Sequence, residues 1–216
     1  MTTNSRSTFA TLGARNHGYG EYDGLDYYAT DPRAVQSLLK MLEECGIVLT
    51  ETVMEPAIGG GHIADVLLKN GHNILGIDVV DRGYQGTNVR DFLADNQLSA
   101  VDIITNPPYG SAEQFVLHAL DIIKQGRYVI MLLRIQFLEG INRYKQLYSK
   151  ELNPQYVYVF SKRTVCSKNG QNFSGHGASC YAWFVWKKGY RGETVIRWIG
   201  PDEINPNQLT LDEDLS

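Results

Sequence analysis

The chain has 216 residues, of which 43% are hydrophobic and 20% are charged, and its formal net charge is −4. These values are typical of one globular domain that can bury a core, and no apolar run approaches the ~20 residues needed to cross a bilayer. The sequence shows no secretory leader and has only three cysteines, without CxxC spacing, so we expect no disulfide framework and a cytoplasmic protein.

The charges are distributed unevenly along the chain. Residues 141–191 carry nine basic residues and one acid, a local charge of +8, whereas residues 1–140 carry ten basic and seventeen acidic residues. This segregation predicts a basic face that meets phosphate groups. The alternative is a charged face that is simply solvated.

The order of predicted elements indicates an α/β protein. A polar, Gly-rich segment over residues 1–25 is predicted to be a mobile arm, and Asp31 is expected to cap a helix that begins at Pro32 and ends before Gly46. Strands at 52–55, 73–78, 101–105 and 127–133 are then expected to alternate with helices at 61–69, 111–124 and 137–149. Strands near 155–160 and 181–186 follow without a clear helix between them. The sequence therefore predicts a doubly wound, mostly parallel sheet with an antiparallel edge.

A glycine loop, E-P-A-I-G-G-G-H-I-A over residues 55–64, follows the first of these strands. Glycines let the backbone approach a ligand at a helix N-terminus. Gly59 and Gly61 fit a dinucleotide fingerprint, and Asp78 ends the next strand where it can bind a ribose hydroxyl; tight strand–helix packing is the alternative. Because Glu55 places a carboxylate where a diphosphate would lie, we expect a cationic ligand with a ribose, S-adenosylmethionine, rather than NAD.

A further acid follows in R-D-F-L. Asp91 can accept a hydrogen bond from an adenine amino group while Phe92 covers the ring face. A helix N-cap beside a core phenylalanine is the alternative. Together, Glu55, Gly59, Gly61, Asp78 and Asp91 are expected at the carboxyl ends of successive strands, where open α/β sheets bind ligands.

The sequence N-P-P-Y-G, residues 106–110, comes directly after the strand at 101–105. An aryl amine is a poor nucleophile because its lone pair is delocalised, and two acceptors aimed at its hydrogens would free that lone pair. The Asn106 side-chain oxygen and the Pro107 carbonyl can be these acceptors in a loop stiffened by proline, and Tyr109 offers a face for a planar substrate. A rigid turn that caps a strand is the alternative.

The motifs together resemble a known family. N-P-P-Y after E-P-x-x-G-x-G is similar to the S-adenosylmethionine-dependent amino-methyltransferases, chiefly the DNA adenine-N6 group, and most closely to its small phage- and prophage-type members. The order Y-A-T-D-P, I-D, D-F and L-L-R-I-Q-F-L-E-G is similar too, and the resemblance covers about residues 26–190. It implies a Rossmann-like class I methyltransferase fold, and methyl transfer from S-adenosylmethionine to the N6 amino group of adenine in DNA.

The resemblance also implies the roles of individual residues and a domain organisation. The catalytic residues would be Asn106, Pro107, Pro108 and Tyr109. The cofactor-binding residues would be Thr30, Glu55, Gly59, Gly61, Asp78, Asp91, Phe92 and Asn106. We expect the methyltransferase domain over residues 26–200 and an acidic, disordered tail over residues 201–216.

No substantial target-recognition domain is present, so the chain after residue 160 or a partner must supply DNA contacts. The basic, Gly-bearing segment 161–179 is predicted to be a nucleic-acid-binding loop that follows a phosphate backbone while Phe173 stacks on a base; a long surface hairpin is the alternative. Its predicted nucleic-acid-binding residues are Lys162, Arg163, Lys168 and Phe173. No metal site is expected, because Cys166, His176 and Cys180 have neither a usual spacing nor a fourth ligand.

Other functions remain open. The same chemistry can act on adenine in RNA or on a protein glutamine, whose amide nitrogen is also planar. The fold can also be retained in an inactive nucleic-acid-binding module, and a nicotinamide oxidoreductase is a third possibility. We expect a monomer or a weak dimer, and a short or relaxed target sequence.

Overall fold

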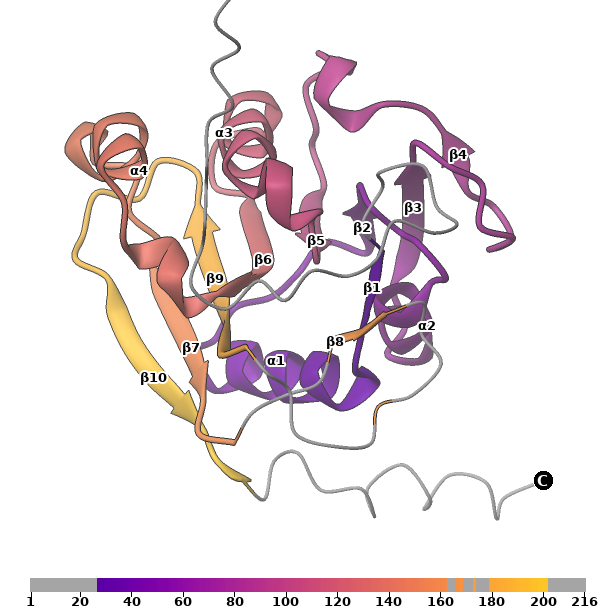
Figure 1. Ribbon diagram of the computed structural model, residues 1–216, viewed down its shortest axis with the longest axis horizontal. Coiled ribbons are helices and arrows are strands. Elements are labelled where there is room, and N and C mark those ends of the chain that lie inside the picture. Colours follow the sequence, from indigo (N-terminus) through magenta and orange to yellow (C-terminus); the bar gives the residue numbers. More distant parts are fainter. Residues whose placement is uncertain (1–26, 163–165, 169–172, 174–178, 202–216) are drawn as a thin grey trace, which may run out of the picture.

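The computed structural model describes residues 27–162, 166–168, 173 and 179–201 (Figure 1). The predicted arm over 1–25, Arg163, most of the predicted 161–179 loop and all but the first residue of the predicted tail lie outside these residues. No helix in the described part of the chain is both long enough and apolar enough to cross a membrane.

An eight-stranded sheet forms the centre of the molecule, in the order β10-β7-β9-β6-β5-β2-β3-β4. Its strands are β2 (Thr52–Glu55), β3 (Asn73–Asp78), β4 (Asn88–Val89), β5 (Asp102–Thr105), β6 (Tyr128–Arg134), β7 (Tyr156–Phe160), β9 (Tyr181–Lys187) and β10 (Val195–Ile199). Neighbouring strands are parallel except where β9 runs antiparallel to both β6 and β7. The predicted α/β fold, a doubly wound, mostly parallel sheet with an antiparallel edge, is confirmed.

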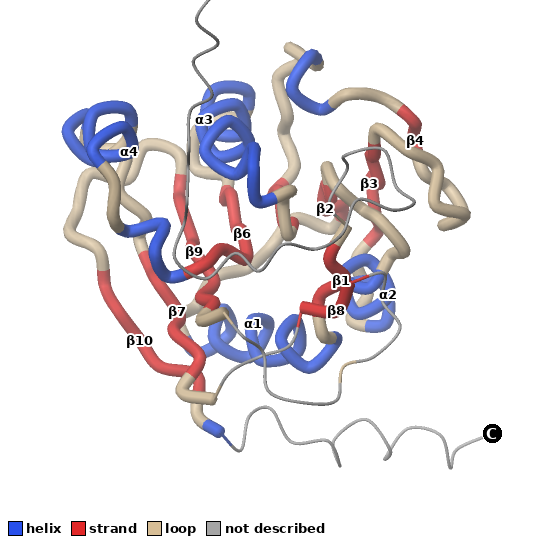
Figure 2. Tube along the Cα trace, in the orientation of Figure 1, coloured by secondary structure: helices blue, strands red, loops and turns tan. Residues whose placement is uncertain are grey.

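Helices cover both faces of this sheet (Figure 2). One face carries α1 (Pro32–Glu44) and α2 (His62–Lys69), and the other carries α3 (Ala112–Ile122) and α4 (Ile141–Gln146). Two hydrophobic clusters result, because successive side chains of a strand point to opposite faces. Along β6, Ile130 and Leu132 join the cluster with α1, whereas Met131 and Leu133 join the cluster with α3.

The first helix begins as the sequence predicts. Pro32 is the first residue of α1, and the Asp31 carboxylate accepts a hydrogen bond from the Arg33 backbone N–H at 2.9 Å, as an N-cap does. The helix expected at 137–149 is shorter, since only α4 is α-helical there. It is flanked by the 3₁₀ turns η3 (Ile135–Leu138) and η4 (Tyr148–Lys150).

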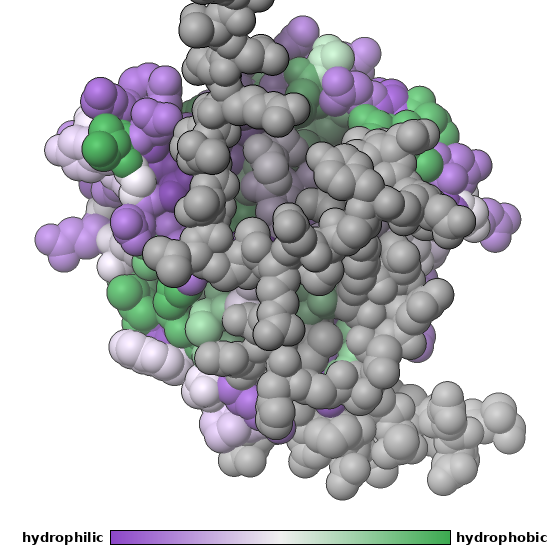
Figure 3. Space-filling view, viewed as in Figure 1, coloured by the Kyte–Doolittle hydropathy of each residue, from purple (hydrophilic) through white to green (hydrophobic). Residues whose placement is uncertain are grey.

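Three short strands and one edge strand were not among the predicted elements. The three-residue strands β1 (Tyr28–Thr30) and β8 (Cys166–Lys168) form a separate antiparallel pair, in which Tyr28 faces Lys168 and Thr30 faces Cys166. The short β4 and the edge strand β10 extend the central sheet at its two ends. Hydrophobic side chains appear on the β10 side of the space-filling view (Figure 3). Within β10, Ile196 is 48% and Trp198 66% exposed.

Candidate active site

A cavity lies at the carboxyl ends of β2, β3 and β5, where the topology of an open α/β sheet places ligands. Eight of the predicted site residues line it: Thr30, Glu55, Asp78, Phe92, Asn106, Pro107, Pro108 and Tyr109. Their chain segments are far apart in the sequence, and the parallel strands bring them to one edge.

The glycine loop lies beside this cavity: Pro56, Ala57 and Ile58 line it, whereas Gly59 and Gly61 are not among the lining residues. Gly59 and Gly61 have φ values of 55° and 80°, the left-handed region that glycine adopts readily. The backbone N–H of Gly59 donates to the Asp78 carboxylate at 2.8 Å, which ties the loop to the end of β3. A Cβ on Gly59 would overlap the ring of Tyr27, so the loop needs glycine here for space as well as for conformation.

Tyr27 covers this loop from the N-terminal side. Its hydroxyl accepts a hydrogen bond from the Gly60 N–H at 2.8 Å and lies 3.1 Å from His62 Nδ1. The Arg82 guanidinium lies over the Tyr27 ring, with its Cζ 4.8 Å from the ring centroid. Both Tyr27 and Arg82 line the cavity, and neither was predicted from the sequence.

Glu55 is a buried carboxyl with an unused oxygen. The residue is 2% exposed, and Oε2 has no hydrogen-bond partner among the described residues. Burial raises the pKa of Glu55 well above its ordinary value of 4.5; the Ala64 backbone N–H offsets part of this rise, and the charges of Asp78 and Asp65 add to it. A cationic group at Oε2 would favour the ionised carboxylate, so the position is suited to a positively charged ligand.

Three other predicted cofactor residues differ in their surroundings. Thr30 is 2% exposed, and its Oγ1 likewise has no partner among the described residues. Phe92 is buried, with its ring centroid 5.2 Å from that of Phe115, and both rings line the cavity. Asp91 is exposed and accepts from the Leu93 N–H at 2.9 Å, as the N-cap of a 3₁₀ turn, η1 (Phe92–Ala94). Asp91 is not among the residues that line the cavity.

Asn106 presents a fixed amide at the end of β5. Its Nδ2 donates to the Tyr28 backbone carbonyl at 2.9 Å. A carbonyl can only accept, so this contact determines which end of the amide is the nitrogen. The buried Oδ1 is then left without a hydrogen-bond partner in the described ranges, and Asn106 provides a free, oriented acceptor to the cavity that it lines.

Tyr109 is held by aromatic and cationic neighbours. Its ring centroid is 5.0 Å from that of Tyr28, its hydroxyl is 2.7 Å from the Tyr181 hydroxyl, and Arg134 Cζ is 4.7 Å from its centroid. Burial, followed by the neighbouring Cys166 and Tyr181, raises the pKa of Tyr109 far above its ordinary value. Tyr109 therefore stays protonated and offers a ring surface rather than a base.

Cys166 also reaches this site, which the sequence analysis did not anticipate. Its Sγ lies 4.0 Å from Asn106 Nδ2, and burial raises the pKa of the thiol to about 11. The contact depends on the pairing of β1 with β8, so no local sequence signal could have shown it. Within the described residues, no group of three His, Cys, Asp or Glu side chains could hold a metal ion; His176 lies outside them, and the absence of a metal stays a prediction.

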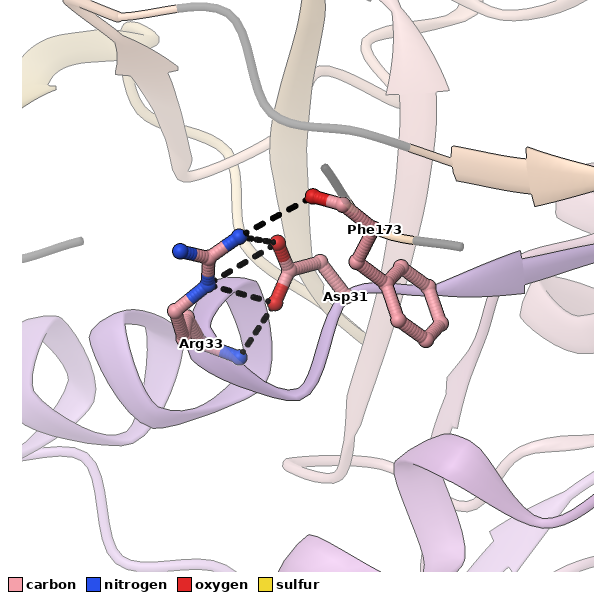
Figure 4. A network of polar contacts seen from close by, with 3 residues as sticks. All are labelled: Asp31, Arg33 and Phe173. Carbon is pink, nitrogen blue, oxygen red and sulfur yellow. Dashed lines mark hydrogen bonds and ion pairs between the residues drawn. The ribbon is translucent and has the colours of Figure 1, made fainter. Parts of the chain in front are cut away.

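The predicted nucleic-acid contacts are described only in part. Lys162 is exposed, and Lys168 belongs to β8. The Phe173 ring lies edge-on to His62, with 5.5 Å between centroids. The Phe173 carbonyl accepts a hydrogen bond from Arg33 at 3.3 Å (Figure 4). Asp31 fixes Arg33 through an ion pair of 2.5 Å. The ring contact places Phe173 next to His62, which belongs to the glycine loop.

No family model and no curated protein matches the sequence, but solved structures match the fold. A proposed RNA methyltransferase of Pyrococcus horikoshii is 19% identical, with a TM-score of 0.56 over 80% of this chain and 93% of that one. A proposed class I S-adenosylmethionine-dependent methyltransferase of Listeria monocytogenes is 14% identical, with a TM-score of 0.56 over 79% and 65%. The methyltransferase subunit of a type I restriction-modification system of Streptococcus thermophilus is 13% identical, with a TM-score of 0.60 over 82% and 48%.

These structures define the fold of the chain. Together with the strand order, they show the Rossmann-like class I methyltransferase fold that was predicted. The chain spans about half the length of the restriction-modification subunit. At these levels of identity the likeness concerns the fold alone.

Proposed function

We propose that the protein is an S-adenosylmethionine-dependent methyltransferase that modifies the N6 amino group of adenine in DNA. The observation that carries this proposal is the Asn106 amide: the Tyr28 carbonyl orients it, and its buried Oδ1 accepts no hydrogen bond from the described residues. An oriented acceptor of this kind suits a substrate NH₂ group. Asn106 lines the same cavity as Glu55 and Asp78, the two acids proposed to bind the cofactor.

The residues on the cofactor side fit S-adenosylmethionine. Two buried oxygens there, Glu55 Oε2 and Thr30 Oγ1, have no partner among the described residues. Glu55 would meet a positive charge of the cofactor, Thr30 would lie near its methionine end, and Asp78 would accept from ribose hydroxyls while still holding Gly59. When bound, the cofactor supplies an activated methyl group. Gly61, Asp91 and Phe92 complete the proposed cofactor set.

The catalytic residues would act on the substrate nitrogen. Asn106 Oδ1 and the Pro107 carbonyl accept its two hydrogens and so favour a pyramidal nitrogen with a free lone pair. Pro107 and Pro108 restrict the backbone that presents these acceptors, and Tyr109 contributes its ring. The nitrogen becomes acidic once it carries the methyl group, and its proton then passes to solvent, so no strongly basic side chain is required.

Two observations favour a nucleic acid as the substrate polymer, and the resemblance of N-P-P-Y to the DNA adenine-N6 group favours DNA. Residues 141–191 carry a local charge of +8, which favours a phosphate backbone. The methyltransferase subunit of a type I restriction-modification system is among the similar structures. Lys162, Arg163, Lys168 and Phe173 are the proposed DNA contacts, in a domain over residues 26–200 that acts as a monomer or a weak dimer. Because one similar structure is a proposed RNA methyltransferase, adenine in RNA is the second candidate.

Methyl transfer from labelled S-adenosylmethionine tests the proposal. Purified protein is incubated separately with adenine-methylation-free DNA, total RNA and protein lysate. We expect label in DNA as N6-methyladenine, and its loss in Asn106→Ala with cofactor affinity retained. Label only in RNA or protein would preserve the chemistry and replace the substrate. No label in any polymer, with the cofactor bound, would contradict the proposed activity and favour an inactive binding module.

A further inference from the structure

The motif L-L-R-I-Q-F-L-E-G over residues 132–140 has no role in the function proposed above. Arg134 is the exposed last residue of β6 and follows two buried leucines. Phe137 then buries its ring against Phe184 at 5.6 Å and Trp186 at 6.2 Å between centroids. The backbone that follows Arg134 is therefore anchored to the core within three residues.

Arg143 holds the backbone turn that follows Arg134. Its guanidinium donates to the carbonyls of Gln136, at 3.3 Å, and Glu139, and its Cζ lies 5.1 Å from the Phe137 centroid. Gly140 has a φ of 135°, and a Cβ there would lie only 2.8 Å from the guanidinium. The motif thus builds a rigid turn whose first side chain is Arg134.

This turn places Arg134 over the proposed catalytic aromatic. Arg134 Cζ is 4.7 Å from the Tyr109 ring centroid. Arg134 is also the register partner of Tyr181 in β9, whose hydroxyl lies 2.7 Å from that of Tyr109. Burial raises the pKa of Tyr181, and its hydrogen bonds with Tyr109 and Arg134, together with the charge of Arg134, offset part of that rise.

Among the residues that the structure describes, no acid forms an ion pair with Arg134. An exposed cation at the carboxyl edge of the sheet, beside a ring suited to a base, is therefore available to a phosphate. Arginine binds phosphate through two parallel hydrogen bonds, which are stronger than an exposed cation–π contact.

We propose that Arg134 positions the target nucleotide of DNA: its guanidinium covers Tyr109 in the free enzyme, yields that ring to the incoming base, and binds a phosphate of the same strand. This inference rests on the proposed function and adds a positioning residue to it. A base and a planar cation use the same ring surface. Because the base would replace the guanidinium on this surface, the Tyr109 ring would stay covered until DNA is present.

Three variants of the full chain test this role. Arg134→Gln removes the charge, Arg134→Lys keeps it, and Arg127→Gln is the matched control, because Arg127 directly precedes the other end of the same strand. Binding of methylation-free duplex DNA is measured by fluorescence anisotropy from 50 to 200 mM salt, which are about the conditions under which phosphate contacts show their salt dependence. KM and kcat for methyl transfer are measured in parallel.

We expect Arg134→Gln to reduce the slope of log affinity against log salt by about 1, the value for one phosphate contact, and to raise KM more than it lowers kcat. Arg134→Lys should restore the slope, and Arg127→Gln should leave it unchanged. A wild-type slope and KM in Arg134→Gln would overturn the proposal. So would a reduced salt slope that Arg134→Lys does not restore, since this would indicate a packing role and not a phosphate contact.

Failure of the proposed function gives a different result. If the wild-type protein transfers no methyl group to DNA, that function fails, and the anisotropy slopes still decide whether Arg134 binds a phosphate. If the wild-type protein methylates DNA and Arg134→Gln matches it in every measurement, only the role of Arg134 fails.

Discussion

Glu55→Gln removes the carboxyl that can ionise beside a bound cation, and it keeps the size and an acceptor oxygen of the side chain. Glu55 is 2% exposed, with one unpartnered oxygen, so a cation bound there would form a hydrogen bond that is shielded from water. A hydrogen bond to a charged group contributes about 1.5–3 kcal/mol. We therefore expect the Kd for S-adenosylmethionine to rise by a factor of about 10 to 100.

Although Glu55→Gln should weaken cofactor binding, it should stabilise the folded protein at pH values between 4.5 and the raised pKa of Glu55. The raised pKa of Glu55 means that, above its ordinary value of 4.5 and below the raised value, the folded protein holds a proton that the unfolded chain has lost. The contribution of Glu55 to the free energy of unfolding is complete below 4.5 and is lost as the pH rises through the raised pKa. Each pH unit inside that window removes about 1.4 kcal/mol, and the variant lacks this loss.

Calorimetric titration with S-adenosylmethionine and urea unfolding between pH 5 and 8 measure the two effects. Glu51→Gln is the control, since Glu51 is an exposed glutamate that directly precedes the same strand. Unchanged cofactor affinity in Glu55→Gln would show that Glu55 meets no cation. If the free energy of unfolding varies with pH in the same way in the wild type and in Glu55→Gln, the buried carboxyl does not hold its proton.

Three further substitutions have defined outcomes. Gly59→Ala forces a Cβ into the Tyr27 ring and an unfavourable φ of 55°, so we expect a loss of at least about 1–2 kcal/mol in urea unfolding together with weaker cofactor binding; wild-type values would refute this. Asp31→Ala removes the cap of α1 and the partner of Arg33, and should lower the free energy of unfolding by about 0.5–2 kcal/mol; no change in the urea midpoint would contradict it. Tyr109→Phe keeps the ring and loses one hydroxyl contact, so kcat should stay within about tenfold of wild type, the effect of one ordinary hydrogen bond, whereas Tyr109→Ala should lose far more. Equal losses in both variants would show that the hydroxyl, and not the ring, matters.

Much of the fold could be predicted because its signals are local. The bounds predicted for β2 and β3, residues 52–55 and 73–78, match the structure, since each is an apolar run next to a glycine-bearing turn. The pair β1–β8 could not be predicted in this way. Each strand has three residues, and they pair across more than 130 residues of chain. The edge strand β10 is rich in Val, Ile and Trp, so its composition did contain a signal that the analysis did not use.

The candidate site was predictable to the extent that its residues follow strands. Glu55, Asp78 and Asn106 each lie at the carboxyl end of a strand or directly after one, and parallel topology then brings them to one cavity. The contacts of Asn106 with Tyr28 and Cys166 were not predictable, because they depend on the β1–β8 pair. The substrate remains a proposal, because the similar structures concern the fold alone.

Nucleoside analysis of methylated DNA tests the central proposal most directly. Methylation-free DNA is treated with the protein and isotopically labelled S-adenosylmethionine, digested to nucleosides, and separated by chromatography with mass detection. The account predicts labelled N6-methyladenine with the wild-type protein, and its loss in Asn106→Ala at unchanged cofactor affinity. Label on any other nucleoside, or N6-methyladenine that persists in Asn106→Ala, would contradict it.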